Sequence, residues 1–299
     1  MSIEAEATLF RRLTLLGSGL IGGSIARAVR ARGDIADEIV IYDRNPAHAA
    51  RIAELEIADR MAATPQAAVQ GADCVILCSP VGTFGDLAAA IAPHMKPGAI
   101  LSDVGSTKQS VIRDVAPLVP DHVHFVPAHP LAGTEYSGPD AGFATLFEGR
   151  WCLLTPLPGT DEASIARVRC LWERMGSMVS SMEAGHHDRV LAIVSHLPHL
   201  IAFTICGTAD DLADETRQQV LQFAATGFRD FTRIAASDPE TWRDVFLNNR
   251  EALLEMLARF TEDAQAMARA VRWGDAAYIE DKIGRGRKIR RSLIELKQA

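Results

Sequence analysis

The sequence predicts an α/β fold in which a doubly wound, mostly parallel sheet is followed by an all-helical C-terminal domain. Short apolar runs of β-forming residues alternate with helical patterns over the first 182 residues, at 13–16, 38–42, 73–78, 99–104, 124–127, 151–155 and 177–182. Nearly continuous apolar strands separated by helices are typical of a parallel sheet that is buried on both faces. From Ala184 onward the strand signal disappears, so we predict two domains, residues 1–183 and 184–299.

Length and composition agree with two globular domains. The chain has 299 residues, of which 48% are hydrophobic and 23% charged, enough apolar material for large cores. Its formal net charge of −7 argues against a nucleic-acid partner, because phosphate binding needs a positive field. A basic cluster near the C-terminus is interpreted as the solvated face of a helix; it comprises Lys282, Arg285, Arg287, Lys288, Arg290 and Arg291.

Several features predict a cytoplasmic protein. The five cysteines are odd in number and contain no Cys-x-x-Cys pair, as expected for reduced thiols. The first twelve residues contain no apolar segment typical of a signal peptide. The longest apolar stretch, 190–206, is interrupted by polar residues and proline, so we expect a buried helix rather than a membrane span.

A second amphipathic segment suggests self-association. Ser237 to Glu240 has the Ser-x-x-Glu pattern of a helix start, with a proline in the first turn. Apolar residues recur at helical spacing from Trp242 to Phe260, which predicts one long helix with a buried face. A helical domain this short needs another surface to complete its core, so we expect a homodimer.

A glycine-rich turn follows the first predicted strand. Its glycines have distinct tasks: Gly17 allows a tight turn, Gly19 lets the backbone approach a pyrophosphate, and Gly22 lets helix and strand pack closely. The helix that begins around Leu20 and Ile21 points its N-terminal N–H groups at the phosphates.

Asp43 completes the pattern of a Rossmann-type dinucleotide site. It ends the second predicted strand about 20 residues after the last glycine, where a carboxylate can accept the ribose hydroxyls. A carboxylate repels a 2′-phosphate, so we expect NAD, while the neighbouring Arg44 leaves NADP possible. Ser79 and Pro80 follow another strand and should line the same cleft.

Three polar stretches mark a substrate site, which the nucleotide fold alone cannot identify. They are 103–108, 128–135 and a discontinuous set between His187 and Arg233. His129 follows the fifth and sixth strands, where a doubly wound sheet has its ligand crevice, so we interpret it as catalytic rather than structural.

At these residues the sequence resembles the prephenate and arogenate dehydrogenase family of tyrosine biosynthesis. The motifs DVGSTK, HPLAGTE, HDRVLAIVSHLPH and GFRDFTRIAASDPETWRD occur in this order, and the resemblance covers nearly the whole chain. It implies oxidative decarboxylation of prephenate, arogenate or both, with reduction of NAD. The two substrates differ in a keto or amino group, and no residue in the sequence identifies which is read.

The resemblance also implies residue roles. His129 would be the catalytic base, Ser106 would orient it, and Arg233 would bind the substrate carboxylate. A neutral imidazole can take a hydroxyl proton at pH 7, and a guanidinium binds a carboxylate through two parallel hydrogen bonds. Further substrate contacts would be His196, His199 and Thr134.

Ordinary structural explanations remain open for some of these residues. Ser106 could cap a helix, since serines at strand-to-helix junctions commonly do. Arg233 could form a surface ion pair with Asp230 or Asp238. His196 and His199 share a helical face and could bind a metal with His187, but no matching carboxylate or cysteine spacing accompanies them, so we expect no metal.

Two alternative functions remain. A β-hydroxyacid dehydrogenase also joins a nucleotide domain to a helical one, but enzymes of that type use a lysine, and none occurs between Lys108 and Lys282. A non-catalytic NAD sensor would not need His129, Ser106 and Arg233 together.

Overall fold

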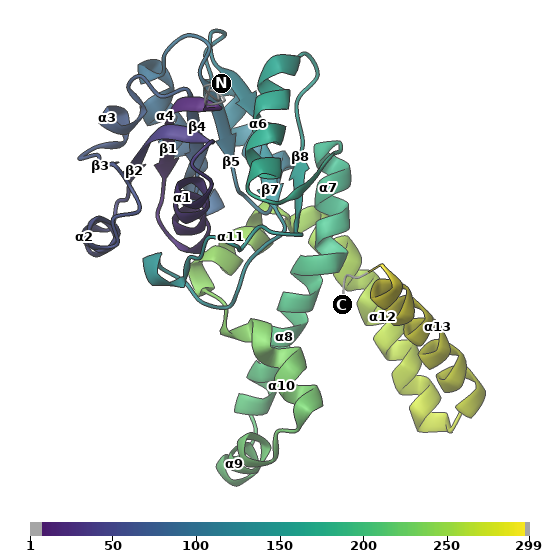
Figure 1. The fold of residues 1–299 in the computed structure, drawn as a ribbon. Helices are drawn as coiled ribbons and strands as arrows, with labels where there is room; N and C mark the ends of the chain where they lie inside the picture. The colour runs from purple at the N-terminus through teal and green to yellow at the C-terminus, as the bar shows by residue number, and fades with distance from the viewer. Residues whose placement is uncertain (1–7, 297–299) are drawn as a thin grey trace, which may run out of the picture. The chain divides into compact units, whose positions relative to one another are not determined.

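The first part of the chain folds around a parallel sheet of six strands. The computed structural model describes residues 8–296 (Figure 1). Every strand pair in this sheet is parallel, in the order β3-β2-β1-β4-β5-β6. The strands are β1 (Phe10–Leu16), β2 (Ala36–Tyr42), β3 (Arg60–Met61), β4 (Cys74–Leu77), β5 (Ile100–Asp103) and β6 (His124–Val126). This confirms the doubly wound α/β fold predicted for the N-terminal part.

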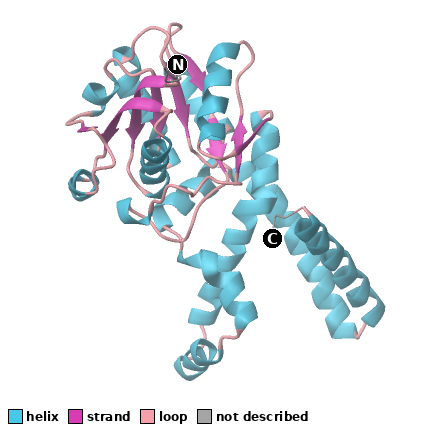
Figure 2. Cartoon of the chain, in the orientation of Figure 1, coloured by secondary structure: helices cyan, strands magenta, loops and turns pink. Residues whose placement is uncertain are grey.

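Helices cover both faces of the sheet (Figure 2). They are α1 (Leu20–Arg32), α2 (Pro46–Glu54), α3 (Pro65–Val69), α4 (Phe84–Ile91), α5 (Gln109–Val115) and α6 (Glu162–Arg174). Along β4, Cys74 and Ile76 join one buried cluster with residues of α1 and α6, whereas Val75 and Leu77 join a second cluster with residues of α3, α4 and α5. Successive side chains of a strand point to opposite faces, which is why both faces needed apolar residues.

A separate three-stranded sheet contains residues that the sequence suggested would extend the parallel sheet. It consists of β7 (Ala128–Pro130), β8 (Trp151–Leu154) and β9 (Met178–Ser181), with β7 antiparallel to β8. The sequence missed β7 and β3 because three and two residues are too few to show a periodicity. His129 lies in β7 opposite Leu153, so strand pairing fixes its backbone.

The described residues after Ala184 contain no strand, as predicted. The helices are α7 (Ala184–Leu191), α8 (Leu197–Asp210), α9 (Asp214–Phe223), α10 (Thr226–Thr232), α11 (Pro239–Asn248), α12 (Arg250–Trp273) and α13 (Ala276–Glu295), with a π-helical turn, Ala192–His196, joining α7 to α8. Pro198 follows this turn and has no N–H to donate, which accounts for the irregular hydrogen bonding.

The single long helix predicted from Ser237 is wrong in two respects. Asp238, not Ser237, caps α11, because its carboxylate accepts a hydrogen bond from the N–H of Thr241 at 2.8 Å. The helix then breaks at Asn249, whose backbone angles are φ −115° and ψ 32°. The apolar periodicity continues through this break, so the sequence does not show it.

The apolar segment from Ala184 to Asp210 is less buried than expected. It is one continuous helical stretch of 27 residues, long and apolar enough by length and composition to cross a membrane, and only 28% of its most apolar window is buried. Ile193 and Val194 are exposed, whereas His187 and His196 are fully buried. The prediction of a buried helix therefore holds for Leu191, Ala192, Leu197 and Ala202 but is wrong for Ile193, Val194 and Ile205, which are exposed.

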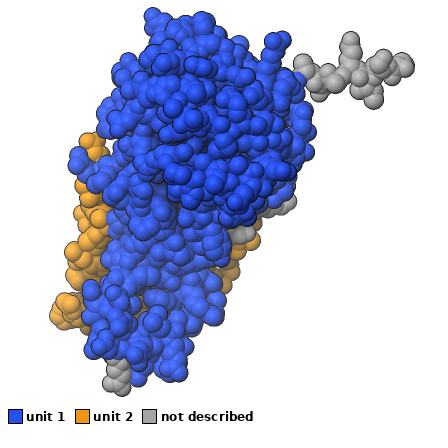
Figure 3. All heavy atoms as spheres, turned by 90° about the vertical axis from the view of Figure 1, so that its left-hand side faces the viewer, with its two compact units in different colours: residues 1–250 blue, residues 251–299 orange. Residues whose placement is uncertain are grey.

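The chain divides into two compact units, residues 1–250 and 251–299 (Figure 3). The second unit is helical, and Lys282 Nζ lies 2.7 Å from Asp263 Oδ1 within it. The basic cluster on α13 is exposed apart from Lys282, which is partly buried. The boundary predicted at residues 183 and 184 marks a change of secondary structure rather than of packing and stays a prediction.

Candidate active site

A cavity of about 840 Å³ lies at the carboxyl ends of the central strands. Its lining includes the glycine turn, residues that follow β2 and β4, and Ser106, Thr134 and Trp242. All predicted cofactor residues except Gly22 line it: Gly17, Gly19, Leu20, Ile21, Asp43, Arg44, Ser79 and Pro80. Ligands of doubly wound sheets bind at this edge.

The glycine turn has the geometry that a dinucleotide requires. Gly17 has φ +109°, and a Cβ there would lie 2.7 Å from the backbone nitrogen of Ser79. A Cβ on Gly22 would lie only 2.1 Å from the carbonyl oxygen of Gly17, so this position must be glycine for α1 to pack on the turn. No atom lies within 4 Å of a Cβ built on Gly19, which caps α1 and leaves its N-terminus open to an anion.

Asp43 is held in one orientation at the end of β2. Its Oδ2 accepts hydrogen bonds from the Ser18 N–H at 2.8 Å and the Ser18 hydroxyl at 2.6 Å, and its Oδ1 accepts from the Asn45 N–H at 2.8 Å. Arg44 pairs with Glu240 at 3.2 Å. The carboxylate therefore stays directed at the cavity, and the guanidinium beside it already has an anionic partner.

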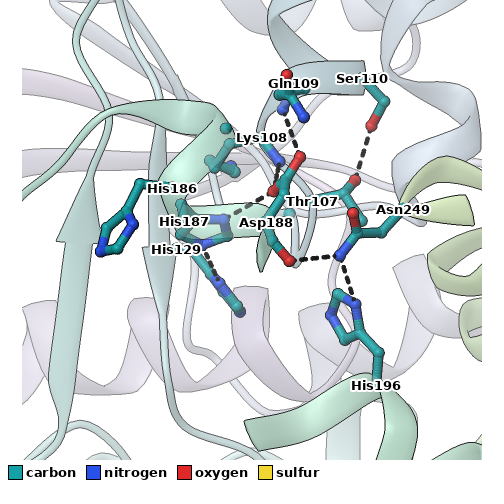
Figure 4. Close-up of polar contacts among 12 residues, drawn as sticks. Thr107, Lys108, Gln109, Ser110, His129, His186, His187, Asp188, His196 and Asn249 are labelled. Atoms are coloured by element: carbon teal, nitrogen blue, oxygen red, sulfur yellow. Dashed lines mark hydrogen bonds and ion pairs between the residues drawn. The ribbon is translucent and has the colours of Figure 1, made fainter. Parts of the chain in front are cut away.

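His129 belongs to a chain of buried hydrogen bonds (Figure 4). Its Nδ1 lies 2.9 Å from Nε2 of His187, and Nδ1 of His187 lies 2.8 Å from Oδ1 of Asp188. The side chain of His129 is 7% exposed, and His187 is fully buried. Burial, reinforced by His187, Lys108 and His196, holds the pKa of His129 well below 6.5. His129 is therefore neutral at pH 7.

A buried ion pair supports the backbone next to His129. Lys108 Nζ contacts Oδ2 of Asp103 and donates to the carbonyl oxygen of Ala128 at 2.7 Å, while the Ala128 N–H donates to Oδ1 of Asp103 at 3.2 Å. Both charged side chains are fully buried. The backbone N–H and C=O of Ala128, the residue before His129, are thereby both satisfied by one ion pair.

His196 lies behind this network, in the π-helical turn. Its Nδ1 lies 2.9 Å from the Asn249 side-chain amide, which also donates to the backbone oxygen of Asp188 at 2.8 Å. The Asn249 nitrogen is a donor, so Nδ1 of His196 accepts and Nε2 carries the proton. That Nε2 is buried without a partner among the described residues. Burial lowers the pKa of His196 to about 4.

Trp242 is a site residue that the sequence analysis missed. Its indole stacks on the imidazole of His199, with ring centroids 3.5 Å apart and planes at 17°, and it lines the cavity. The apolar periodicity of the sequence places Trp242 only on the buried face of a helix. A half-buried aromatic pair is suited to contact a ligand ring.

Arg233 forms neither of the ion pairs considered from the sequence. It pairs with Glu135 at 2.8 Å rather than with Asp230 or Asp238, and its side chain is 59% exposed. Glu135 belongs to the second polar stretch and lines the cavity beside Thr134. The fold thus brings the Arg233 guanidinium to Glu135, a cavity residue that lies 98 positions earlier in the chain.

Of the predicted catalytic and substrate-binding residues, Ser106 and Thr134 line the cavity directly, and the others do not. Ser106 lines the cavity, but within residues 8–296 it makes no hydrogen bond to His129, whose Nδ1 contacts His187 instead. Both ring nitrogens of His187 are engaged, so it does not join His196 and His199 as a metal ligand. The cavity is not lined by His129, His196, His199 or Arg233 themselves.

Comparisons with known proteins agree along nearly the whole chain. Residues 25–181 match the family described as prephenate dehydrogenase, nucleotide-binding domain, and residues 183–283 match prephenate dehydrogenase, dimerization domain. The chain is 40% identical to cyclohexadienyl dehydrogenase of Zymomonas mobilis, over 96% of this chain and 97% of that protein. It is 32% identical to prephenate dehydrogenase of Bacillus subtilis, over 88% of this chain and 71% of that protein.

A solved structure shows the same similarity in three dimensions. The structure of prephenate dehydrogenase from A. aeolicus in complex with hydroxyphenyl propionate and NAD+ superimposes with a TM-score of 0.85, at 32% identity, covering 95% of this chain and 98% of that one. The motifs, the cavity and both matched domains lead to one conclusion: the chain belongs to the prephenate dehydrogenase family.

Proposed function

We propose that this protein catalyses the NAD-dependent oxidative decarboxylation of prephenate, arogenate or both. The observation that carries the proposal is that His129 is buried and neutral, in the same fold as a cavity suited to a dinucleotide. The lining of that cavity includes the Asp43 carboxylate and Trp242, which stacks on His199. The relatives that support the activity are named for prephenate and for cyclohexadienyl substrates.

The residues at the glycine turn fit NAD. The open N-terminus of α1 at Leu20 and Ile21 would bind the pyrophosphate, and Asp43 would accept hydrogen bonds from the ribose hydroxyls. Because Ser18 and Asn45 fix Asp43, its negative charge would oppose the 2′-phosphate of NADP. NAD supplies a hydride acceptor when bound.

The side chains then divide the work of the reaction. His129 would accept the proton of the substrate hydroxyl as hydride leaves the same carbon, since a general base must be neutral at the working pH. Loss of CO₂ from the resulting ketone completes an aromatic ring and needs no further base. Arg233 would bind a substrate carboxylate, and Thr134, Ser106, His196 and His199 would complete the site.

A β-hydroxyacid dehydrogenase is less consistent with this site. Lys108 is the only lysine within the four family motifs. Its ammonium group is fully buried against Asp103. A lysine held in this way cannot donate to a substrate in the cavity.

We also propose that the protein is a cytoplasmic homodimer assembled through the helices that follow Ala184. The match to a dimerization domain over residues 183–283 supports the pairing, as do the exposed apolar side chains of Ile193, Val194 and Ile205. All five cysteines are free, as expected for a reducing compartment. Light scattering coupled to gel filtration should give twice the mass of 32.4 kDa, and a monomer would contradict the pairing.

NADH formation tests the activity directly. The purified protein is incubated with NAD and, in separate reactions, with prephenate, arogenate and a β-hydroxyacid, while NADH absorbance is recorded. We expect NADH with at least one of the first two and none with the third. His129→Asn should lower kcat by about 10²-fold or more and change KM little. Absence of NADH with both cyclohexadienols would refute the proposed function.

A further inference from the structure

Asp188 is the fixed end of the hydrogen-bond chain that contains His129. Its Oδ1 accepts from the Lys108 N–H at 2.7 Å, and its Oδ2 accepts from the Gln109 N–H at 2.9 Å (Figure 4). Both donors belong to the start of α5, where free N–H groups and the helix dipole favour a negative charge. Although burial opposes ionisation, these hydrogen bonds and the one from His187 keep the pKa of Asp188 below its usual value. Asp188 is therefore an acceptor.

The acceptor at Asp188 fixes the proton positions along the chain. Nδ1 of His187, 2.8 Å from Oδ1 of Asp188, must donate. A neutral His187 then has an unprotonated Nε2, which must accept from Nδ1 of His129 at 2.9 Å. This leaves Nε2 of His129 without a proton. Among the described residues, this Nε2 of His129 has no hydrogen-bond partner. It is also absent from the set of fully buried polar atoms that lack a partner, so it is open to solvent.

His187 must be neutral for Nε2 of His129 to be free of a proton. Burial and the ammonium group of Lys108 lower its pKa, whereas Asp188 and Asp103 raise it, and the net direction is downward. A charged His187 would donate from Nε2 to Nδ1 of His129 and force the His129 proton onto the other nitrogen. The neutral form gives the arrangement in which His129 can act as a base.

We propose that His187 and Asp188 are positioning residues that hold His129 in the tautomer with its proton on Nδ1, leaving Nε2 to take the substrate proton. This inference rests on the proposed role of His129 as the base. In the reaction, the hydroxyl O–H bond breaks and an N–H bond forms at Nε2. The resulting imidazolium keeps its Nδ1–H bond to His187, so no proton needs to move along the chain.

Two substitutions of His187 distinguish positioning from bulk packing. In His187→Gln the amide nitrogen can donate to Asp188 and the amide oxygen can accept from His129, the same polarity as the imidazole. His187→Leu removes both hydrogen bonds. His186 is the matched control, because it is exposed and directed away from His187 in Figure 4. The control variant is His186→Leu.

We expect kcat to fall about 10²-fold in His187→Leu, with a smaller change in KM, and to recover to within about tenfold of the wild type in His187→Gln. His186→Leu should retain wild-type kcat. Equal kcat values for the two His187 variants, whether high or low, would overturn the inference.

The tautomer can also be measured without turnover. In long-range nitrogen–proton correlation spectra of the wild-type protein with isotope-labelled histidine, His129 should show a protonated Nδ1 and an unprotonated Nε2. The signal is identified by its loss in His129→Asn. The opposite tautomer would overturn the inference even if the enzyme is active. If the wild type makes no NADH, the proposed function fails, and the spectrum still tests the hydrogen-bond chain.

Discussion

Acidification should destabilise this protein through His196, a buried histidine that stays neutral when folded. In the unfolded chain its pKa returns to 6.5, whereas in the folded protein it is about 4. Between these values the unfolded state binds a proton that the folded state excludes. The stabilisation is therefore complete above pH 6.5 and is lost as the pH falls toward 4.

The two pKa values give the size of the effect. Their difference corresponds to about 3.4 kcal/mol of unfolding free energy once both states are protonated. At about pH 5 only part of this is lost, which amounts to about 2 kcal/mol relative to about pH 7.5. The pKa values of His129 and His187 are lowered as well, so the unfolding free energy of the whole protein should fall by more than the His196 contribution alone.

The variant His196→Asn isolates the contribution. Its side-chain oxygen can accept from Asn249 as Nδ1 of His196 does, and it does not titrate. Urea unfolding at one fixed protein concentration, at about pH 7.5 and about pH 5, gives the free energy of unfolding for both proteins. We expect the variant to lose about 2 kcal/mol less than the wild type on acidification. Equal losses would show that His196 is protonated in the folded state and would refute the reasoning.

Three further predictions concern ligand binding. Gly22→Ala should weaken NAD binding at least about tenfold in a fluorescence titration, because its Cβ would overlap the Gly17 carbonyl. The control is Gly85→Ala, since a Cβ on Gly85 would meet no atom nearer than 3.5 Å. An unchanged Kd in Gly22→Ala would contradict the site. Asp43→Asn removes the charge that opposes a 2′-phosphate, so kcat/KM for NADP relative to NAD should rise about tenfold, and a constant ratio would be evidence against its role. Arg233→Gln should raise the substrate KM about tenfold with little change in kcat. The control is Arg217→Gln, which also removes an ion-paired arginine but on another helix, and it should leave KM unchanged. A wild-type KM in Arg233→Gln would exclude Arg233 from substrate binding.

The cofactor half of the site could be predicted because its chemistry depends on local sequence. The spacing of Gly17, Gly19 and Gly22 lies within six residues and can be recognised locally, even though the backbone of Ser79 adds to the requirement at Gly17, and Asp43 follows at the end of the next strand. The family motifs also singled out His129 and Arg233, whose roles stay predictions; Arg233 pairs with Glu135, which lines the cavity.

The partners of those residues could not be predicted, since they depend on contacts between distant segments. His129 and His187 are 58 positions apart, and Asn249 is 53 positions from His196. An apolar periodicity passes unbroken through Asn249 although the helix does not, because turning the backbone there lets its side chain reach two buried acceptors. Trp242 is likewise assigned to a core from the sequence, because periodicity shows which face of a helix is apolar. It does not show that the His199 ring stacks on Trp242.

The capping of α5 by Asp188 has a consequence for exchanging parts between related enzymes. His129 lies in the segment matched as nucleotide-binding domain, whereas His187 and Asp188 lie in the segment matched as dimerization domain. A chimera joined at residue 182 would inherit its proton acceptor from one parent and the groups that orient it from the other. A crossover placed after Asp188 would keep the acceptor and its orienting groups from a single parent.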